Sequence, residues 1–128
     1  MKGKITYIKD LCFLGEIENH SIILDDGKNS LSPMQALLLS LATCTAMDVV
    51  VILKKKRQNL EKLEIEIEGK RKDEYPKIFE EIKINYIFKG DLEEKACKDA
   101  IELSIQKYCS IANMLKDKVK MEYAFKIT

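Results

Sequence analysis

The sequence has little of what many catalytic and binding sites require. It contains no tryptophan, one histidine and two prolines. A glycine-rich phosphate loop, a serine nucleophile motif and a paired-acid motif are all absent. The 22 lysines and arginines nearly balance the 21 aspartates and glutamates, so a net charge of +1 provides no field to attract a nucleic acid or an anionic membrane. We therefore expect neither of these partners.

Four cysteines are present, but none forms the closely spaced pair of a zinc site: Cys12, Cys44, Cys97 and Cys109. With a single histidine beside them, we expect no metal and no bound cofactor. The N-terminal segment has no apolar run followed by a small-residue cleavage site, so we expect a cytoplasmic protein. Thiols stay reduced in the cytoplasm, which favours free thiols, catalytic or buried, over a disulfide scaffold.

The chain is long enough for one compact domain, which we expect to span residues 1–128. Apolar residues alternate with charged ones at 63–67, 82–88 and 119–127, which predicts strands with one buried face. Two or three weaker strands are expected before residue 25. The spacing becomes helical between Gly90 and Tyr108, and a short helix follows from Ser110 to about Lys116. This β-β-β-α-β-β-α-α-β order predicts an α+β fold with antiparallel sheet.

A long apolar helix is predicted from Ser32 to Leu53, because Ser32 is a good N-cap and Pro33 suits the first helical position. The segment is about as long as a bilayer requires, roughly 20 residues. Five polar residues interrupt it, which favours a buried helix in a soluble protein: Gln35, Ser40, Thr43, Thr45 and Asp48. A helix that is apolar nearly all round needs cover on every side. We therefore predict a homodimer with this helix in the interface.

Three residues on this helix, Ser40, Cys44 and Asp48, are spaced by four and form one polar line, which indicates a pocket. A lone cysteine is usually a small core residue. A buried carboxylate, however, needs a partner. The partner is either a lysine of another element, in a structural ion pair, or a group of a functional site. Asp48 would also disfavour a Cys44 thiolate unless a cation lay nearby.

Cys109 stands in KYCSIANML, where two predicted helices meet. A sulfur near a helix N-terminus is stabilised as a thiolate by backbone N–H groups. Two neighbouring thiols suffice for peroxide chemistry, because one becomes a sulfenic acid and the other condenses with it to a disulfide. This chemistry requires the fold to bring the two cysteines together.

The stretches SPMQALLLSLATCTAMDVV and KYCSIANML resemble the OsmC/Ohr family of osmotically induced and organic hydroperoxide resistance proteins. The resemblance implies antiparallel sheets around two long central helices in an intertwined homodimer. It also implies a thiol peroxidase that reduces organic hydroperoxides of the alkyl or fatty-acid type. Cys44 matches the peroxidatic cysteine and Cys109 the resolving one, and a dithiol or protein thiol reductant would recycle the pair.

The sequence departs from the family at the residues that activate the reactive cysteine. The resemblance implies a glutamate after the proline of the central helix, paired with an N-terminal arginine. Here Met34 and then Gln35 follow Pro33, and the N-terminal third has no arginine, as in an OsmC-like branch without this pair. The cation could instead be Lys2, Lys4 or His20, or a partner's lysine or arginine. His20 is otherwise an exposed turn residue. The candidate pocket-lining residues are Ser40, Asp48, Met34, Gln35 and His20.

Two functions therefore remain open at the level of sequence. One is the thiol peroxidase. The other is a non-catalytic or weakly catalytic dimer that binds a small apolar ligand in its interface cleft. A structural dimer with buried thiols would show neither property.

Overall fold

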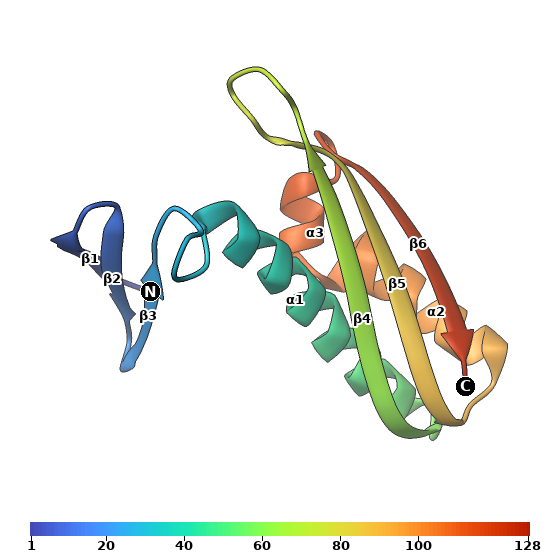
Figure 1. Ribbon diagram of the computed structural model, residues 1–128. Coiled ribbons are helices and arrows are strands. Elements are labelled where there is room, and N and C mark those ends of the chain that lie inside the picture. Colours follow the sequence, from blue (N-terminus) through green and yellow to red (C-terminus); the bar gives the residue numbers. More distant parts are fainter. The chain divides into compact units, whose positions relative to one another are not determined.

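A computed structural model describes all residues, Met1–Thr128, as two compact units, Met1–Leu37 and Leu38–Thr128 (Figure 1). In chain order the elements are β1 (Gly3–Lys9), β2 (Cys12–Ile17), β3 (His20–Leu24), α1 (Pro33–Lys55), β4 (Asn59–Arg71), β5 (Phe79–Asp91), α2 (Glu94–Leu103), the π-helical turn η1 (Ser104–Tyr108), α3 (Ser110–Leu115) and β6 (Lys120–Ile127). The predicted succession of strands and helices is confirmed. The single domain over residues 1–128 stays a prediction.

The N-terminal unit is an antiparallel sheet in the order β1-β2-β3. The Asp25 carboxylate shapes the loop that follows, because it accepts hydrogen bonds from the N–H groups of Gly27, Asn29 and Ser30. The loop ends in a reciprocal cap at the start of α1. The Gln35 N–H donates to Ser32 Oγ at 3.2 Å, and the Ser32 N–H donates to Gln35 Oε1 at 2.9 Å. The predicted N-cap at Ser32 is therefore confirmed.

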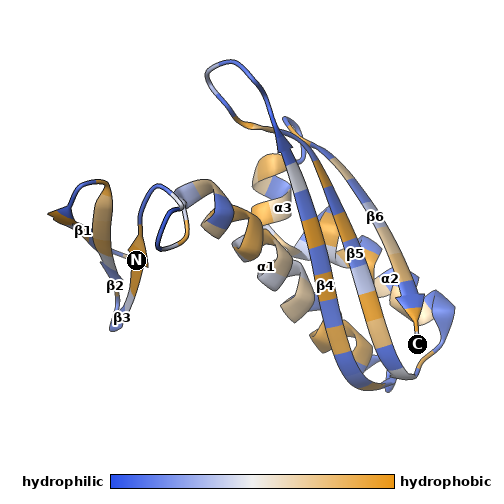
Figure 2. Cartoon of the chain, viewed as in Figure 1, coloured by the Kyte–Doolittle hydropathy of each residue, from blue (hydrophilic) through white to orange (hydrophobic).

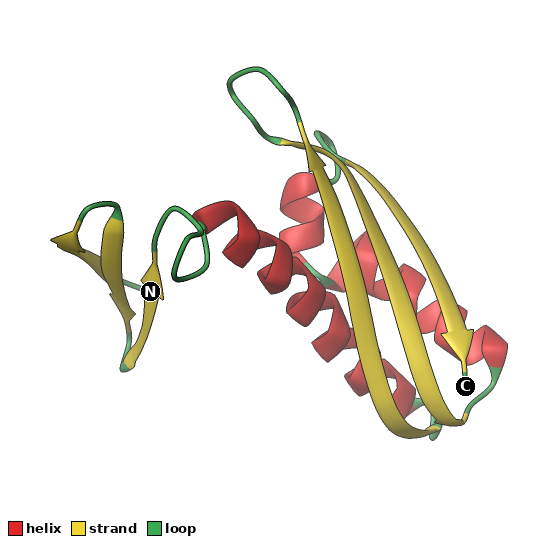
Figure 3. Cartoon of the chain, viewed as in Figure 1, coloured by secondary structure: helices red, strands yellow, loops and turns green.

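The C-terminal unit is built on a sheet in the order β4-β5-β6. β4 and β5 are antiparallel, as predicted, but β6 runs parallel to β5. The reason is the connection: α2, η1 and α3 carry the chain back along the sheet before β6 begins, and such a crossover joins parallel strands. The helices cover one face of the sheet (Figure 3).

Alternation along β4 and β5 places charged residues on the outer face of this sheet and apolar ones against the helices (Figure 2). Large side chains fill the core between them; those that are fully buried include Leu41, Val49 and Leu53 of α1, Ile82, Ile84, Tyr86 and Phe88 of β5, and Ile101 of α2. The core of the C-terminal unit therefore lies between β5 and the helices.

Helix α1 remains only partly covered within the chain. By length and composition it could cross a membrane, and 28% of its most apolar window is buried. Leu39, Met47, Val50 and Val51 are exposed on it. One long apolar helix is weak support for a membrane span, because helices in the cores of soluble proteins have the same composition. The exposed residues form an apolar surface that this chain itself leaves uncovered.

Candidate active site

Two thiols from distant parts of the chain meet in the C-terminal unit. Cys44 lies half-buried on α1, and Cys109 is fully buried where η1 passes into α3. Both are free thiols, and Cys44 lies close enough to Cys109 to raise the pKa of the Cys109 thiol. The fold therefore provides the proximity that disulfide chemistry between them requires.

Cys109 is the N-cap of α3. Its Sγ accepts a hydrogen bond from the Ala112 N–H at 3.4 Å, and its own N–H donates to the Ser104 carbonyl at 2.7 Å. The helix N-terminus predicted for this cysteine is present. Burial nevertheless raises the pKa of the Cys109 thiol to about 11, with smaller upward contributions from Cys44 and Asp48. Desolvation outweighs the Ala112 N–H, so the expected stabilisation of a thiolate is overcome and Cys109 is a thiol at neutral pH.

A chain of four hydrogen-bonded side chains runs beside the thiols. Tyr86 OH of β5 lies 2.8 Å from Thr45 Oγ1 of α1, which lies 2.7 Å from Ser104 Oγ of η1. Ser104 Oγ in turn donates to Asp48 Oδ2 at 2.9 Å. Each hydroxyl has one proton, so the Ser104 donation fixes the others: Thr45 donates to Ser104, and Tyr86 donates to Thr45. All three hydrogen bonds therefore run in the same direction, from Tyr86 to the Asp48 carboxylate.

This arrangement gives the partner that Asp48 requires. The sequence left open whether this partner is a lysine of another element or a group of a functional site. In the structure the partner is the Ser104 hydroxyl. Burial raises the pKa of Tyr86 to about 12, which keeps its hydroxyl protonated as the first donor of the chain. The buried hydroxyls are all paired, as buried polar groups must be.

Asp48 also lines a cavity of about 390 Å³ between α1 and the α2–η1 segment. The other lining residues are Val51, Ile52, Lys55, Lys56, Leu103 and Tyr108. The walls are mainly apolar. Along α1, the Asp48 carboxylate lies at one end of the cavity, and Lys55 and Lys56 lie at the other. Cys44 lies one helical turn before Asp48, about 6 Å along the axis. We name this cavity the α1 groove.

The predicted site residues fall into two groups. Asp48 joins Cys44 and Cys109 in the C-terminal unit, and exposed Ser40 lies one turn before Cys44. Met34, Gln35 and His20 belong to the N-terminal unit, where Gln35 caps α1 and exposed His20 begins β3. Their place in a pocket stays a prediction.

Sequence reasoning missed the hydroxyl chain and most of the groove. Thr45 and Ser104 were visible only as polar residues within helical apolar patterns, and Tyr86 as one member of a strand alternation. A buried hydroxyl that interrupts an apolar face needs a partner, and this requirement was the available signal.

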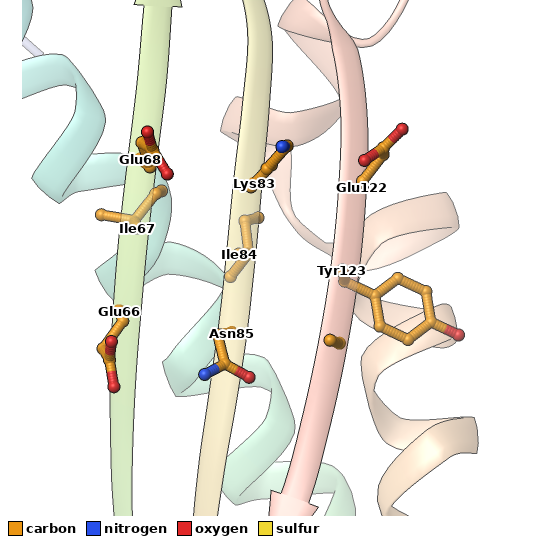
Figure 4. Close-up of a pocket in the computed structure, with 9 residues that line it drawn as sticks. Glu66, Ile67, Glu68, Lys83, Ile84, Asn85, Glu122 and Tyr123 are labelled. Carbon is orange, nitrogen blue, oxygen red and sulfur yellow. The ribbon is translucent and has the colours of Figure 1, made fainter.

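The other candidates are less suited to chemistry. No group of three or more His, Cys, Asp and Glu side chains is placed to hold a metal ion. Cys97 is fully buried in α2, and burial raises its pKa. A second cavity, about 380 Å³, lies over the sheet (Figure 4). Glu66, Glu68, Lys83 and Glu122 line it with charges of both signs, as on a solvated sheet face, and no thiol is among its lining residues.

Fold and site together define a small α+β protein with two neighbouring free thiols, one half-buried and one fully buried. A model of the OsmC-like protein family matches residues 25–124, and the chain belongs to this family. Protein YhfA of Escherichia coli is 35% identical over 131 residues, which cover 99% of this chain and 98% of YhfA. The family and the α+β fold predicted from the sequence are therefore confirmed.

Solved structures agree with this assignment. The crystal structure of an Aquifex aeolicus protein matches with a TM-score of 0.93 at 35% identity, covering 99% of this chain and 95% of that one. An organic hydroperoxide resistance protein from Elizabethkingia anophelis matches with a TM-score of 0.78 at 11% identity, covering 98% and 94%. At that identity the likeness shows the fold alone.

Proposed function

We propose that the protein is a cysteine-based thiol peroxidase that reduces organic hydroperoxides, with Cys44 peroxidatic and Cys109 resolving. The observation that carries the proposal is the pairing of a half-buried thiol with a fully buried one, far apart in the sequence. Membership of the OsmC-like family supports it, as does the shared fold with proteins named for hydroperoxide resistance.

The reaction balances in two steps. The Cys44 sulfur attacks the terminal oxygen of the hydroperoxide, the O–O bond breaks, and the proton of the Cys44 thiol is transferred to the alkoxide, which leaves as an alcohol. Cys44 is then a sulfenic acid. The Cys109 sulfur attacks the Cys44 sulfur, an S–S bond forms, and the hydroxyl leaves as water. An external dithiol or protein thiol returns both cysteines to thiols, so no bound cofactor is needed.

The α1 groove is the proposed place for the organic part of the substrate. Val51, Ile52 and Leu103 offer an apolar wall for an alkyl or fatty-acid chain. The groove adjoins Asp48, one turn from Cys44, so a hydroperoxide lying along it would point its reactive end toward the thiols. An apolar groove of this kind favours organic peroxides over hydrogen peroxide.

We also propose a homodimer in which two α1 helices lie at the centre, in an intertwined arrangement. Its support is the apolar surface that one chain leaves uncovered, on α1 and on the N-terminal sheet, where Ile5 and Tyr7 are more than half exposed. A three-stranded sheet with an uncovered apolar face needs a partner surface. We place this dimer in the cytoplasm, where reduced thiols persist.

The test is stopped-flow mixing of the fully reduced protein with cumene hydroperoxide and with hydrogen peroxide, followed by disulfide mapping. We expect faster consumption of the organic peroxide and a Cys44–Cys109 disulfide. Cys44→Ser should abolish the reaction, and Cys109→Ser should form a sulfenic acid that overoxidises after few turnovers. Full activity of Cys44→Ser would refute the proposal. Cys12→Ser is the matched control and should react at the wild-type rate.

A second function, binding of a small apolar ligand, is supported by Met34 at the position of the family's activating glutamate together with the apolar wall of the α1 groove. It predicts peroxide turnover no faster than that of a free thiol, and saturable binding of an apolar fluorescent probe. A Leu103→Asp variant should lose that binding, whereas Glu64→Gln on the outer sheet face should keep it.

A further inference from the structure

The Asp48 carboxylate is held where a proton must move in the proposed reaction. Ser104 connects it with Cys109: the Ser104 hydroxyl donates to Asp48 Oδ2 at 2.9 Å, and the Ser104 carbonyl accepts the Cys109 N–H at 2.7 Å. Cys44 lies on the same line of α1 one turn before Asp48, and its thiol is close enough to Cys109 to raise the pKa of the Cys109 thiol. Carboxylate and both sulfurs therefore belong to one cluster.

The second step of the reaction cannot proceed without a proton acceptor. Cys109 is fully buried and is a thiol at neutral pH. Its proton has to leave as its sulfur bonds to Cys44, and water does not reach a side chain with no exposed surface. The departing hydroxyl of the Cys44 sulfenic acid needs a proton at the same moment. A group that takes the first proton and supplies the second would serve both needs.

We propose that Asp48 is the general base and acid of the resolving step. It takes the proton from the Cys109 sulfur as the S–S bond forms, and it gives that proton to the hydroxyl that leaves Cys44, so that water departs and the carboxylate is restored. This assignment rests on the proposed peroxidase function and deepens it. The protein would then have a catalytic carboxylate on α1, even though Met34 replaces the glutamate that the family resemblance implies after Pro33.

The hydroxyl chain holds that carboxylate in place. Ser104 occupies Asp48 Oδ2 with a donated hydrogen bond and is itself held by Thr45, which is held by Tyr86. Because all three hydroxyl protons point toward Asp48, the hydroxyl chain holds Oδ2, and we assign the proton from Cys109 to Oδ1. Ser104, Thr45 and Tyr86 are positioning residues.

Charged groups around Asp48 come from several elements. Lys55 and Lys56 share the groove from the end of α1, and Tyr108 shares it from η1. Cys109 and Tyr86 face the carboxylate from the η1–α3 junction and from β5. The two lysines bring positive charge to the groove that Asp48 lines.

The test isolates the attack of Cys109 and needs no peroxide. In a Cys12→Ser background, one equivalent of 5,5′-dithiobis(2-nitrobenzoate) forms a mixed disulfide at half-buried Cys44. Attack by Cys109 then releases a second thionitrobenzoate, which is followed by absorbance. We expect Asp48→Asn to slow this second release at least tenfold at pH 7, a modest part of what a general base contributes. Asp48→Glu should restore part of the rate.

If Asp48 is only a neighbouring charge, Asp48→Asn should change the rate of the second release in the opposite direction. Its negative charge raises the pKa of Cys109, so neutralising it would make Cys109 more acidic and the release faster. Unchanged or faster release in Asp48→Asn, or no second release from the wild-type protein, overturns the assignment. Because the assay omits peroxide, failure of the peroxidase proposal in stopped flow is a separate result.

Ser104→Ala tests the positioning role. In the wild-type background Ser104→Ala should slow the second release, and in the Asp48→Asn background it should have little further effect, because the two residues act through one hydrogen bond. A merely structural loss would lower the rate by the same factor in both backgrounds, and would refute the role of Ser104. Tyr123→Phe is the matched control, because it removes a hydroxyl that donates to Glu102 and does not belong to the hydroxyl chain. It should behave as wild type.

Discussion

The proposed dimer can be tested by placing lysines on the uncovered face of α1. Met47 is 65% exposed and Val50 is 43% exposed, so together they contribute about one full apolar side chain of uncovered surface. Burying one such side chain stabilises by about 1.5–3 kcal/mol. In a two-fold interface each residue counts twice, which gives roughly 3–6 kcal/mol for the dimer.

The double variant Met47→Lys, Val50→Lys should therefore raise the dimer dissociation constant by about 100-fold or more, since about 1.4 kcal/mol corresponds to a factor of ten. Sedimentation equilibrium at micromolar concentration measures it. Tyr75→Lys is the control, because it replaces an 86% exposed aromatic residue in the β4–β5 loop and should leave the dimer intact. A monomeric wild-type protein, or an unchanged dissociation constant in the variant, would refute the reasoning.

Three further predictions concern stability and are checked by denaturant or thermal unfolding of the reduced protein. Ser32→Ala removes one half of the reciprocal cap with Gln35 and should lower the free energy of unfolding by about 1 kcal/mol. Gly90→Ala should cost at least ~2 kcal/mol, because φ is +142° there and the new methyl group would collide with the backbone oxygen of Asn59; wild-type stability would contradict this. Because the pKa of Cys109 is raised from 9.0 to about 11, the folded state holds its proton more tightly, so the free energy of unfolding should fall by ~2–3 kcal/mol between pH 9 and 11. Cys109→Ser should lose that part of the decline, and an identical pH dependence in both proteins would show that the burial argument is wrong.

Local patterns were sufficient for much of the fold. Period-2 alternation located the three C-terminal strands, and the Ser32–Pro33 start of α1 followed from capping preferences. These signals depend on neighbours within a few residues, so they are readable from one sequence. The helix predicted from Gly90 to Tyr108 was less accurate. β5 continues to Asp91, α2 begins at Glu94, and the last turn is π-helical. Helix and strand ends depend on tertiary contacts that periodicity does not contain.

The residues that meet around the two thiols were partly predictable, and their hydrogen-bond partners were not. The spacing of Cys44 and Asp48 indicated a polar line, and the helix junction indicated the capping position of Cys109. The direction of β6 and the partner of Asp48 were not predictable. Thr45 bonds to residues 41 and 59 positions away, and such pairings arise only when sheet and helices are packed together.

The burial of Cys109 also decides which half of a redox cycle would be difficult. An external thiol can reach only the half-buried sulfur of Cys44, so it would attack there and expel Cys109. A thiol with a pKa of about 11 is a poor leaving group, because departure is faster for thiols of low pKa. Reduction of the disulfide would then depend on a proton delivered to Cys109 inside the site. A peroxidase built in this way would be limited by its recycling, and its reductant would have to present a thiol small or narrow enough to approach Cys44 from the outside.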